Sequence, residues 1–473
     1  MRMTRITTAA LAAALCATLF ATSGQAAGPV LIAIGTISGF YEDFATETAP
    51  PLENGVAGNR LGGIGSALAY AGGDDFLALP DRGPNAVMFN ACTDDTVTYI
   101  NRFHTLHMTL APSDPKMVPA LPFTLTPMVV ATTPLSTHAP LVYGPGCGAV
   151  GDGAPALNEL DHTNYFTGRS DGFESGLPST NPLNARLDPE GIRVSADREH
   201  VFISDEYGPY VYEFDRRTGR RTRIFSLPST FAVQNLSAIG NDEIANNHVG
   251  RVTNKGMEGL AITPDGRTLV GAMQSPLLQD GGDIKGGVTR IVTIDTRTGQ
   301  TRQYAYQLDG SVKTTISEIL AVNDHEFLVD ERDSKGLADD SQAVFKRLYK
   351  IDLAGASDVS HISGQANLAP HAVPKQLFLD IVAVLTANGM SPFDIPAKLE
   401  GLAFGQDVTI KGVIKHTLYV ANDNDYLPVV PNAHGTTTSN PNRWFVFAFD
   451  SGDLPGYQPQ HFKDKDHDDR DDR

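Results

Sequence analysis

The chain has 473 residues, which is long enough for one large all-β domain or for two to three ordinary domains. Its 45 glycines and 30 prolines favour many short strands joined by turns. The formal charge of −18 at pH 7 argues against nucleic acid as a partner, because phosphate backbones bind basic surfaces, and it suits a protein that handles cations.

Residues 1–26 have the pattern of a secretory signal peptide. Arg2 and Arg5 give the segment a positive start, residues 9–20 form a short apolar run, and residues 24–26 include the small residues that a signal peptidase reads. The apolar run is too short to stay as a membrane anchor, and no later stretch is apolar enough to span a bilayer. We therefore expect export, either to the periplasm or out of the cell, and no membrane span.

The cysteines fit an exported protein. Cys16 lies inside the apolar run and would leave with the signal peptide, so that Cys92 and Cys147 remain. Such a pair favours a disulfide in an oxidising compartment, although two free thiols stay open as the alternative. The chain has no CxxC motif and no Cys/His cluster, so the sequence does not predict a zinc site.

A short phrase with a glutamate at the start of a predicted strand recurs four times along the chain. The fullest unit continues with three more apolar strands, and its turns carry Asp and Gly where these residues stabilise tight bends. Four short strands per unit, repeated at intervals of some tens of residues, are typical of a β-propeller. The four copies are Pro189-Glu190-Gly191-Ile192, Met257-Glu258-Gly259-Leu260, Ser317-Glu318-Ile319-Leu320 and Leu399-Glu400-Gly401-Leu402.

The repeat therefore predicts an all-β fold, a β-propeller of about six four-stranded blades with one short helical insertion. A shorter opening copy spans residues 65–82, and residues 103–131 alternate well enough to supply further strands. We expect residues 27–45 to contribute a strand that closes the ring. Residues 375–389 are expected to form the helix, which would end at Gly389.

Two segments lie outside the repeat. Residues 132–187 are rich in Pro, Gly, Asn and Ser and predict long loops over one face. Residues 461–473 carry a dense run of charge that predicts disorder. The expected organisation is a signal peptide over 1–26, a propeller domain over 27–455 and a disordered charged tail over 456–473.

The repeated glutamates predict a ring of carboxylates, because the first strand of each propeller blade lines the central channel. Such a ring is costly unless a cation sits in it, and clustered oxygen ligands suit Ca²⁺. Alternatively, each glutamate accepts hydrogen bonds from backbone N–H groups and holds neighbouring blades together. Which further carboxylates share the rim stays open; those at the ends of the second strands are Asp81, Asp205, Glu206, Glu331 and Asp423.

Basic residues adjoin the same motifs. Arg82, Lys255 and Arg332 lie beside the predicted carboxylate ring in the sequence. Cations in this position are what an anionic, metal-bridged ligand such as a phosphate ester needs. Salt bridges that only neutralise the ring are the alternative.

The order of these motifs resembles the family described as esterase-like activity of phytase. The likeness spans about residues 60–450 and thus nearly the whole chain after the signal peptide. It implies an exported bacterial protein with a phytase-like propeller domain that hydrolyses phosphomonoesters or other esters and uses calcium. The motifs that carry it are Asp81-Arg82-Gly83-Pro84-Asn85, Asp188-Pro189-Glu190-Gly191, Asp205-Glu206-Tyr207-Gly208, Lys255-Gly256-Met257-Glu258-Gly259, Val329-Asp330-Glu331-Arg332, Leu399-Glu400-Gly401 and Asn422-Asp423-Asn424-Asp425.

Two functions follow as hypotheses. The first is an exported, metal-dependent hydrolase of phosphate esters that acts as a monomer on a small anionic substrate. The second is a non-catalytic propeller whose ring holds structural Ca²⁺ and whose loops bind a ligand or partner. For the hydrolase, the expected catalytic residues are Arg82, Lys255 and Arg332, and the expected calcium ligands are Asp81, Glu190, Glu206, Glu258, Glu331, Glu400 and Asp423.

Overall fold

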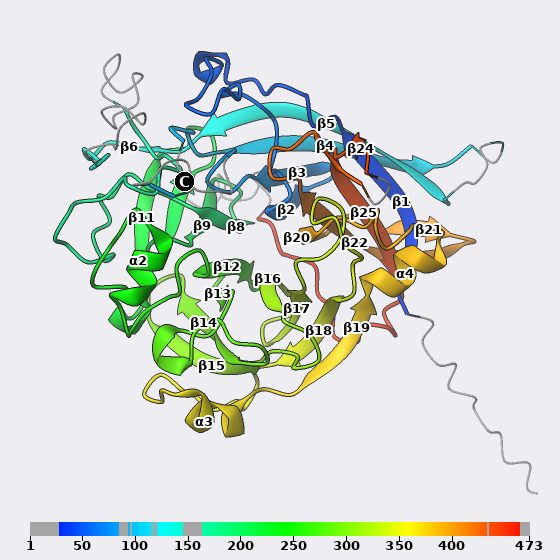
Figure 1. The fold of residues 1–473 in the computed structure, drawn as a ribbon. Coiled ribbons are helices and arrows are strands. Elements are labelled where there is room, and N and C mark those ends of the chain that lie inside the picture. Colours follow the sequence, from blue (N-terminus) through cyan, green and yellow to red (C-terminus); the bar gives the residue numbers. More distant parts are fainter. Residues whose placement is uncertain are drawn as a thin grey trace, which may run out of the picture.

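The computed structural model describes residues 28–84, 93–94, 97–114, 116, 121–144, 163–432 and 435–463. Within these residues, five antiparallel sheets form a closed ring of propeller blades (Figure 1). The first strand of each sheet contacts the first strands of both neighbouring sheets, so the innermost strands surround one channel. The predicted fold class is confirmed. The ring has five blades where about six were predicted, because the remaining length forms loops and one strand that joins the last blade.

Each of the first four blades is built from consecutive strands, with the first strand innermost. Blade 1 contains β2 (Ala67–Gly72), β3 (Asp75–Leu79), β4 (Arg102–Pro112) and β5 (Phe123–Pro134). Blade 2 contains β8 (Pro189–Val194), β9 (His200–Asp205), β10 (Tyr210–Asp215) and β11 (Arg221–Ser226). Blade 3 contains β12 (Met257–Ile262), β13 (Thr268–Met273), β14 (Val288–Asp295) and β15 (Thr301–Gln307). Blade 4 contains β16 (Thr315–Ala321), β17 (Glu326–Arg332), β18 (Lys346–Asp352) and β19 (Lys375–Asp380).

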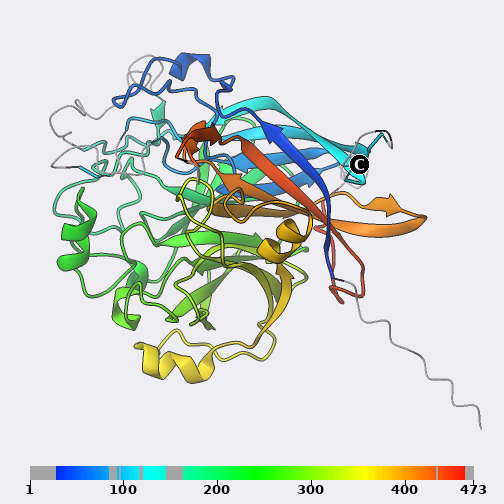
Figure 2. The ribbon, with the colours of Figure 1, turned by 45° about the vertical axis from the view of Figure 1, so that its right-hand side comes forward.

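Blade 5 combines segments from both ends of the chain. It contains β20 (Lys398–Phe404), β22 (Val413–Asp423) and β25 (Asn442–Phe449), and β1 (Val30–Ile37) pairs antiparallel with β25. β21 (Val408–Ile410) forms a hairpin with the start of β22 that projects from the ring (Figure 2). The prediction that residues 27–45 supply the strand that closes the ring is confirmed.

Short elements occur in the connections between strands. The small sheets are β6 (Ser136–Thr137) with β7 (Asn164–Tyr165) and β23 (Val429–Pro431) with β24 (Thr437–Ser439). The α-helices are α2 (Gly240–Ala245), α3 (Gln365–Leu368) and α4 (Ile381–Ala387). The 3₁₀ turns are η1 (Thr46–Thr48), η3 (Ser229–Phe231), η4 (Leu278–Asp280) and η5 (Ala369–His371).

The hydrophobic core is divided among the interfaces between blades. Each of the five largest apolar clusters joins two neighbouring blades, as where Ile192 and Ile203 of blade 2 pack with Leu77 and Leu79 of blade 1. The inner strands β8 and β12 are buried along their whole length, whereas the outer strand β11 alternates between partly buried and exposed residues and has one buried residue, Phe225. Apolar burial therefore holds the blades together and leaves the mouth of the channel to polar side chains.

The predicted helix over residues 375–389 is only partly correct. Residues 375–380 form β19, which pairs with β18 and completes blade 4. The helix α4 begins after Asp380, whose side chain accepts a hydrogen bond from the Ala383 N–H at 3.0 Å. It ends before Gly389, which has a φ of 90°. Strand pairing thus overrides the helical pattern of the first six residues.

Some predictions concern residues outside the described ranges. These are the signal peptide over residues 1–26, the pairing of Cys92 with Cys147 and the charged end over residues 464–473. No helix in the described part of the chain is long and apolar enough to cross a membrane.

Residues 456–463, which belong to the predicted tail, pack across the end of the channel. Three of their backbone N–H groups donate to carbonyls that follow the first strands of blades 4, 3 and 2. The donor–acceptor pairs are Gln458–Val322 at 2.8 Å, His461–Pro264 at 2.9 Å and Lys463–Ala196 at 2.8 Å. The ring of Tyr457 lies 4.5 Å from that of Phe404 in blade 5. The segment therefore ties four blades together.

We expect a chain that ends at residue 455 to unfold at a lower temperature than the full chain. It loses three backbone hydrogen bonds and the packing of Tyr457, which together stabilise the fold by about 3–5 kcal/mol. A chain that ends at residue 463 keeps these contacts and is the matched control, so its melting temperature should equal that of the full chain. Thermal unfolding followed by circular dichroism measures both, and equal melting temperatures for the two shortened chains would contradict this role.

Candidate functional site

The glycine of the repeated Glu-Gly phrase allows adjacent blades to meet at the channel. A Cβ on Gly191 would lie 2.6 Å from the Cβ of Leu260, and a Cβ on Gly259 would lie 2.7 Å from the nitrogen of Ile319. Both neighbours belong to the first strand of the next blade, so a side chain at either glycine would push the blades apart. Packing of the inner strands therefore explains the glycine.

The glutamate of the phrase lies in a β-bulge. The register of β12 shifts between Met257 and Gly259, and the registers of β8 and β20 shift at the corresponding place. A bulge inserts one residue and re-aims its side chain. As a result, Glu190, Glu258 and Glu400 all line one cavity at the mouth of the channel.

Glu318 does not join these three glutamates. The bulged residue of β16 is Ser317, which therefore holds the position that Glu258 has in β12. Glu318 accepts hydrogen bonds from the backbone N–H groups of Leu260 and Ile319, each at 2.9 Å. The alternative interpretation of the motif, in which a glutamate holds neighbouring blades together, applies to this residue.

Arg193 spans the channel below the cavity. Its guanidinium lies 2.9 Å from a Glu318 oxygen and donates to the carbonyls of Leu68 at 2.8 Å and Ile319 at 2.9 Å. Arg193 belongs to blade 2, whereas these partners belong to blades 1 and 4. The Arg193 side chain thus separates the charged cavity from the apolar end of the channel. Arg193 and Phe404 both line that apolar end.

The ends of the second strands reach the same rim as the glutamates, because the first two strands of each blade are antiparallel. Strand register places one equivalent residue of each blade at this rim. All five residues line the cavity. In order from blade 1 to blade 5, they are Asp81, Glu206, Gln274, Arg332 and Asp423.

Glu331, predicted as a calcium ligand, lies outside the cavity. It precedes Arg332 by one residue, and successive residues of a strand point to opposite faces. Its carboxylate accepts a hydrogen bond from the Tyr306 hydroxyl at 2.9 Å and pairs with the Lys375 ammonium at 2.6 Å. Glu331 therefore stabilises the interface between blades 3 and 4 and does not contribute to the carboxylate ring.

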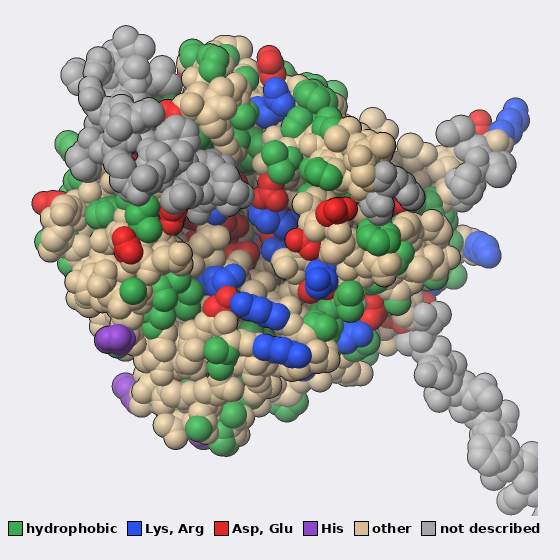
Figure 3. All heavy atoms as spheres, viewed as in Figure 1, with side chains coloured by type: hydrophobic (Ala, Val, Ile, Leu, Met, Phe, Trp, Pro, Cys, Tyr) green, Lys and Arg blue, Asp and Glu red, His purple; other side chains and the backbone are tan. Residues whose placement is uncertain are grey.

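The cavity at the channel mouth has a volume of about 320 Å³. Figure 3 shows it as a hollow near the centre of one face, where acidic and basic side chains gather. Its lining residues are Asp81, Arg82, Glu190, Glu206, Asn254, Lys255, Glu258, Gln274, Lys313, Thr314, Thr315, Arg332, Ser334, Lys398, Glu400 and Asp423.

Two groups of three carboxylates come close together at this cavity. In each group, one oxygen from each residue lies within 4.8 Å of the others. All five residues involved are at most 8% exposed, and one of them is common to both groups. The first triad is Asp81, Asp188 and Glu190, and the second triad is Glu190, Glu206 and Glu258.

Burial and repulsion between neighbouring carboxyls raise the pKa values of Glu190, Glu206 and Asp81. Burial raises the pKa of Glu190 well above its ordinary value, and the neighbouring Glu258 raises it further. The same two causes raise the pKa of Glu206. The pKa of Asp81 is raised by burial and then by Asp423. Ionising the whole group is therefore unfavourable unless positive charge is added.

The two triads offer the oxygens that a hard cation requires. The Oε1 atom of Glu258 accepts a hydrogen bond from Gln274 at 2.7 Å, but its buried Oε2 accepts none from a described residue. Glu190 is 7% exposed and forms no hydrogen bond or ion pair with the described part of the chain. Buried carboxylates normally have partners, so these oxygens fit a divalent cation such as Ca²⁺.

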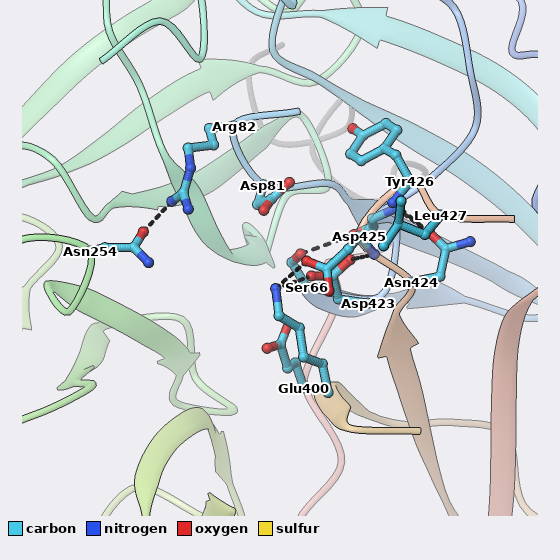
Figure 4. Close-up of polar contacts among 12 residues, drawn as sticks. Ser66, Asp81, Arg82, Asn254, Glu400, Asp423, Asn424, Asp425, Tyr426 and Leu427 are labelled. Atoms are coloured by element: carbon cyan, nitrogen blue, oxygen red, sulfur yellow. Dashed lines mark hydrogen bonds and ion pairs between the residues drawn. The ribbon is translucent and has the colours of Figure 1, made fainter. Parts of the chain in front are cut away.

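Arg82 lies at the acidic side of the cavity. Its guanidinium pairs with Asp188, lies 3.8 Å from a Glu206 oxygen and contacts the side chain of Asn254. Figure 4 shows this contact, with Asp81 between Arg82 and the loop that carries Asp423, Asn424 and Asp425. Among the described residues, Arg82 is the one cation that forms an ion pair with either triad.

The other two predicted catalytic residues also line the cavity. Arg332 pairs with Glu400, and the Lys255 ammonium donates to the side-chain oxygen of Gln274 at 3.2 Å. The Lys255 side chain is 27% exposed, whereas that of Arg332 is 7% exposed. Lys255 is therefore the more accessible cation for a ligand that enters from solvent.

Sequence reasoning missed Lys398 and Asp188 as site residues. The Lys398 ammonium pairs with Asp423 at 2.8 Å and with Asp425 at 2.5 Å, and Asp188 pairs with Arg82. Each missed residue lies two positions before a repeated glutamate. That spacing was the available signal, because residues two apart on a strand share a face.

The fold and the cavity together define a five-bladed propeller with a carboxylate-rich channel mouth. The chain belongs to the family described as Phytase-like, esterase-like activity of phytase, whose family model matches residues 59–426. The resemblance inferred from the repeated motifs is thereby confirmed.

Individual similar proteins add context. An uncharacterized secreted protein from Arthroderma benhamiae is 30% identical over 260 residues, which cover 48% of this chain and 47% of the relative, so the chain spans about half of that relative's length. A periplasmic gluconolactonase from Pseudomonas aeruginosa is 12% identical, with 82% of this chain and 89% of that chain covered and a TM-score of 0.30. The PQQ-bound aldose sugar dehydrogenase from Streptomyces coelicolor is 11% identical, with 81% and 79% covered and a TM-score of 0.29.

Asp330 provides a test of how burial acts on the channel carboxyls. It lies on β17 opposite Glu318, is fully buried, and accepts no hydrogen bond from a described residue at either oxygen. Burial raises its pKa well above the ordinary value, and the nearby Arg332 offsets this in part. A carboxyl with a raised pKa binds more protons in the folded than in the unfolded state. Its contribution to stability therefore falls as the pH rises from the unfolded pKa, about 3.9, toward the folded pKa.

We expect the stability of Asp330→Asn relative to the wild type to increase from pH 5 to pH 8, because the amide cannot ionise. Between the unfolded and folded pKa values, the difference in unfolding free energy should change by about 1.4 kcal/mol per pH unit. Chemical unfolding of both proteins over this pH range measures the difference. A difference that does not change with pH would show that Asp330 is not held protonated by burial.

Proposed function

We propose that this protein is an exported, Ca²⁺-dependent hydrolase of small phosphate esters. The observation that carries the proposal is the meeting, in one cavity, of basic side chains and of buried carboxylates, one of which has an oxygen without a partner among the described residues. Carboxylates alone suit a cation and basic groups alone suit an anion, but the two together suit an anion bridged to a cation. Membership of a family described by ester hydrolysis and phytase supports this assignment.

The acidic side of the cavity would hold the cation through the two triads, with Arg82 fixing the orientation of Asp188. A bound divalent cation neutralises charge on a phosphate oxygen and lowers the pKa of a water molecule. The five carboxylates would thus position the cation, and their low exposure would exclude bulk water from it.

The basic side would bind the ester. Lys255 and Lys313 line the cavity and are partly exposed, so their ammonium groups can reach phosphate oxygens at the mouth. Arg332 lies deeper, where its pairing with Glu400 fixes the guanidinium. A volume of about 320 Å³ limits the substrate to a small molecule. The signal-like pattern of residues 1–26 and the secreted relative support export.

A second candidate function is a non-catalytic propeller with structural Ca²⁺. The observation that favours it is that Arg82 and Arg332 are already paired with Asp188 and Glu400 inside the cavity. Neutralising buried charge is a sufficient role for such pairs, without any part in catalysis. This candidate predicts cation binding without release of phosphate from any ester.

We expect the purified protein to release phosphate from a simple aryl phosphate, to lose this activity with a chelator and to regain it with Ca²⁺. Lys255→Gln should lower kcat/KM at least about tenfold, because a cation near the phosphate is removed from a water-poor site. Lys285→Gln is the matched control, since Lys285 is exposed, lies outside the cavity and bonds the Ser311 carbonyl. Its kcat/KM should match the wild type. Equal losses in both variants would contradict the role of Lys255, and no release of phosphate at any Ca²⁺ concentration would favour the non-catalytic propeller.

A further inference from the structure

The two carboxylate triads are arranged as two sites that share one residue. Asp81 follows β3 of blade 1 and Asp188 precedes β8 of blade 2, whereas Glu206 follows β9 of blade 2 and Glu258 lies on β12 of blade 3. Glu190 has two carboxylate oxygens and can serve one site with each. A single cation would leave part of this set unused.

The charge of the triads also exceeds what one divalent cation neutralises. If all five buried carboxylates are ionised, Arg82, the one cation of the described residues that forms ion pairs with them, leaves four negative charges. The other cations nearby are engaged elsewhere in the cavity wall. Lys398 pairs with Asp423 and Asp425, Arg332 pairs with Glu400, and Lys255 lies 3.9 Å from Asp283. Two divalent cations supply the missing charge.

The side chains without partners belong to this same group. Glu190, the shared residue, is 7% exposed and has no hydrogen-bond or ion-pair partner in the described part of the chain. The buried Oε2 of Glu258 also accepts no hydrogen bond from a described donor. An unsatisfied buried carboxylate is costly unless a cation contacts it. The unpartnered Oε2 of Glu258 therefore marks the second triad, and Glu190 lies where both triads meet.

We infer that the cavity binds two divalent cations, one in each triad, with Glu190 as the ligand common to both. The inference rests on the proposed function for the presence of a cation, and it adds the number of cations and the role of Glu190. Asp81 and Asp188 would serve the first cation, and Glu206 and Glu258 the second. Occupation of one site would favour the other, because the shared carboxylate is then already in place.

The test is the number of Ca²⁺ ions bound by the chelator-treated full mature chain. Isothermal titration with CaCl₂ and elemental analysis after equilibrium dialysis measure this number directly. We expect about two ions per chain for the wild type and about one for either Glu258→Gln or Asp81→Asn. Glu190→Gln should weaken both sites at least tenfold. Glu213→Gln is the control, because Glu213 lies on β10 outside the cavity and bonds Thr222; it should bind two ions.

The outcomes separate this inference from the proposed function. A wild-type ratio of one or zero overturns the two-cation site, even if Ca²⁺-dependent release of phosphate is observed. A ratio of two without hydrolysis supports the two-cation site and overturns the hydrolase. If Glu258→Gln and Asp81→Asn each remove the same ion, so that the double variant still binds one, the assignment of one cation to each triad is wrong. If a variant fails to fold, the number of Ca²⁺ ions bound per wild-type chain still tests the two-cation site.

Discussion

Burial of excess negative charge is the constraint on which the rest of this structure depends. Five carboxylates lie at the mouth of the channel, each at most 8% exposed, with one guanidinium paired to them. Uncompensated, each buried charge costs several kcal/mol. The fold tolerates this only if protons or cations neutralise the group, and the raised pKa values of Glu190 and Glu206 express the same conflict.

The scaffold meets this constraint with rigid, repeated geometry. Apolar clusters between adjacent blades stabilise the ring without filling the channel. The Glu-Gly phrase combines two roles: its glycine allows the inner strands to approach, and its bulged glutamate turns toward the cavity. Below the cavity, Arg193 and Glu318 span the channel and anchor blades 1, 2 and 4 to one another. Glu190 and Glu258 lie on strands, and the other three carboxylates lie within two residues of a strand end, which suits a site with fixed geometry.

The repeat and its turns were enough to predict the fold class, the closing strand and the cavity-lining glutamates Glu190, Glu258 and Glu400. These features depend on local patterns that recur with constant spacing. The pattern could not reveal register, and register decides which side of a strand a residue occupies. Glu318 was misplaced because the bulge of β16 falls on Ser317 and not on Glu318. Glu331 was misplaced because it lies one position before Arg332 and therefore points away from the carboxylate ring. The helix predicted over residues 375–389 was too long, because residues 375–380 pair with β18 and the local sequence does not reveal this pairing.

The most direct test of the account is the melting temperature of the chelator-treated protein with Ca²⁺ and with Mg²⁺ at equal ionic strength. A cation that binds only the folded state at about one hundred times its dissociation constant stabilises it by about 2.7 kcal/mol. We expect Ca²⁺ to raise the melting temperature more than Mg²⁺ does. We also expect Glu258→Gln to reduce the response to Ca²⁺ and Glu213→Gln to leave it intact. Equal effects of the two cations, with both variants behaving alike, would contradict a cation site at the channel mouth.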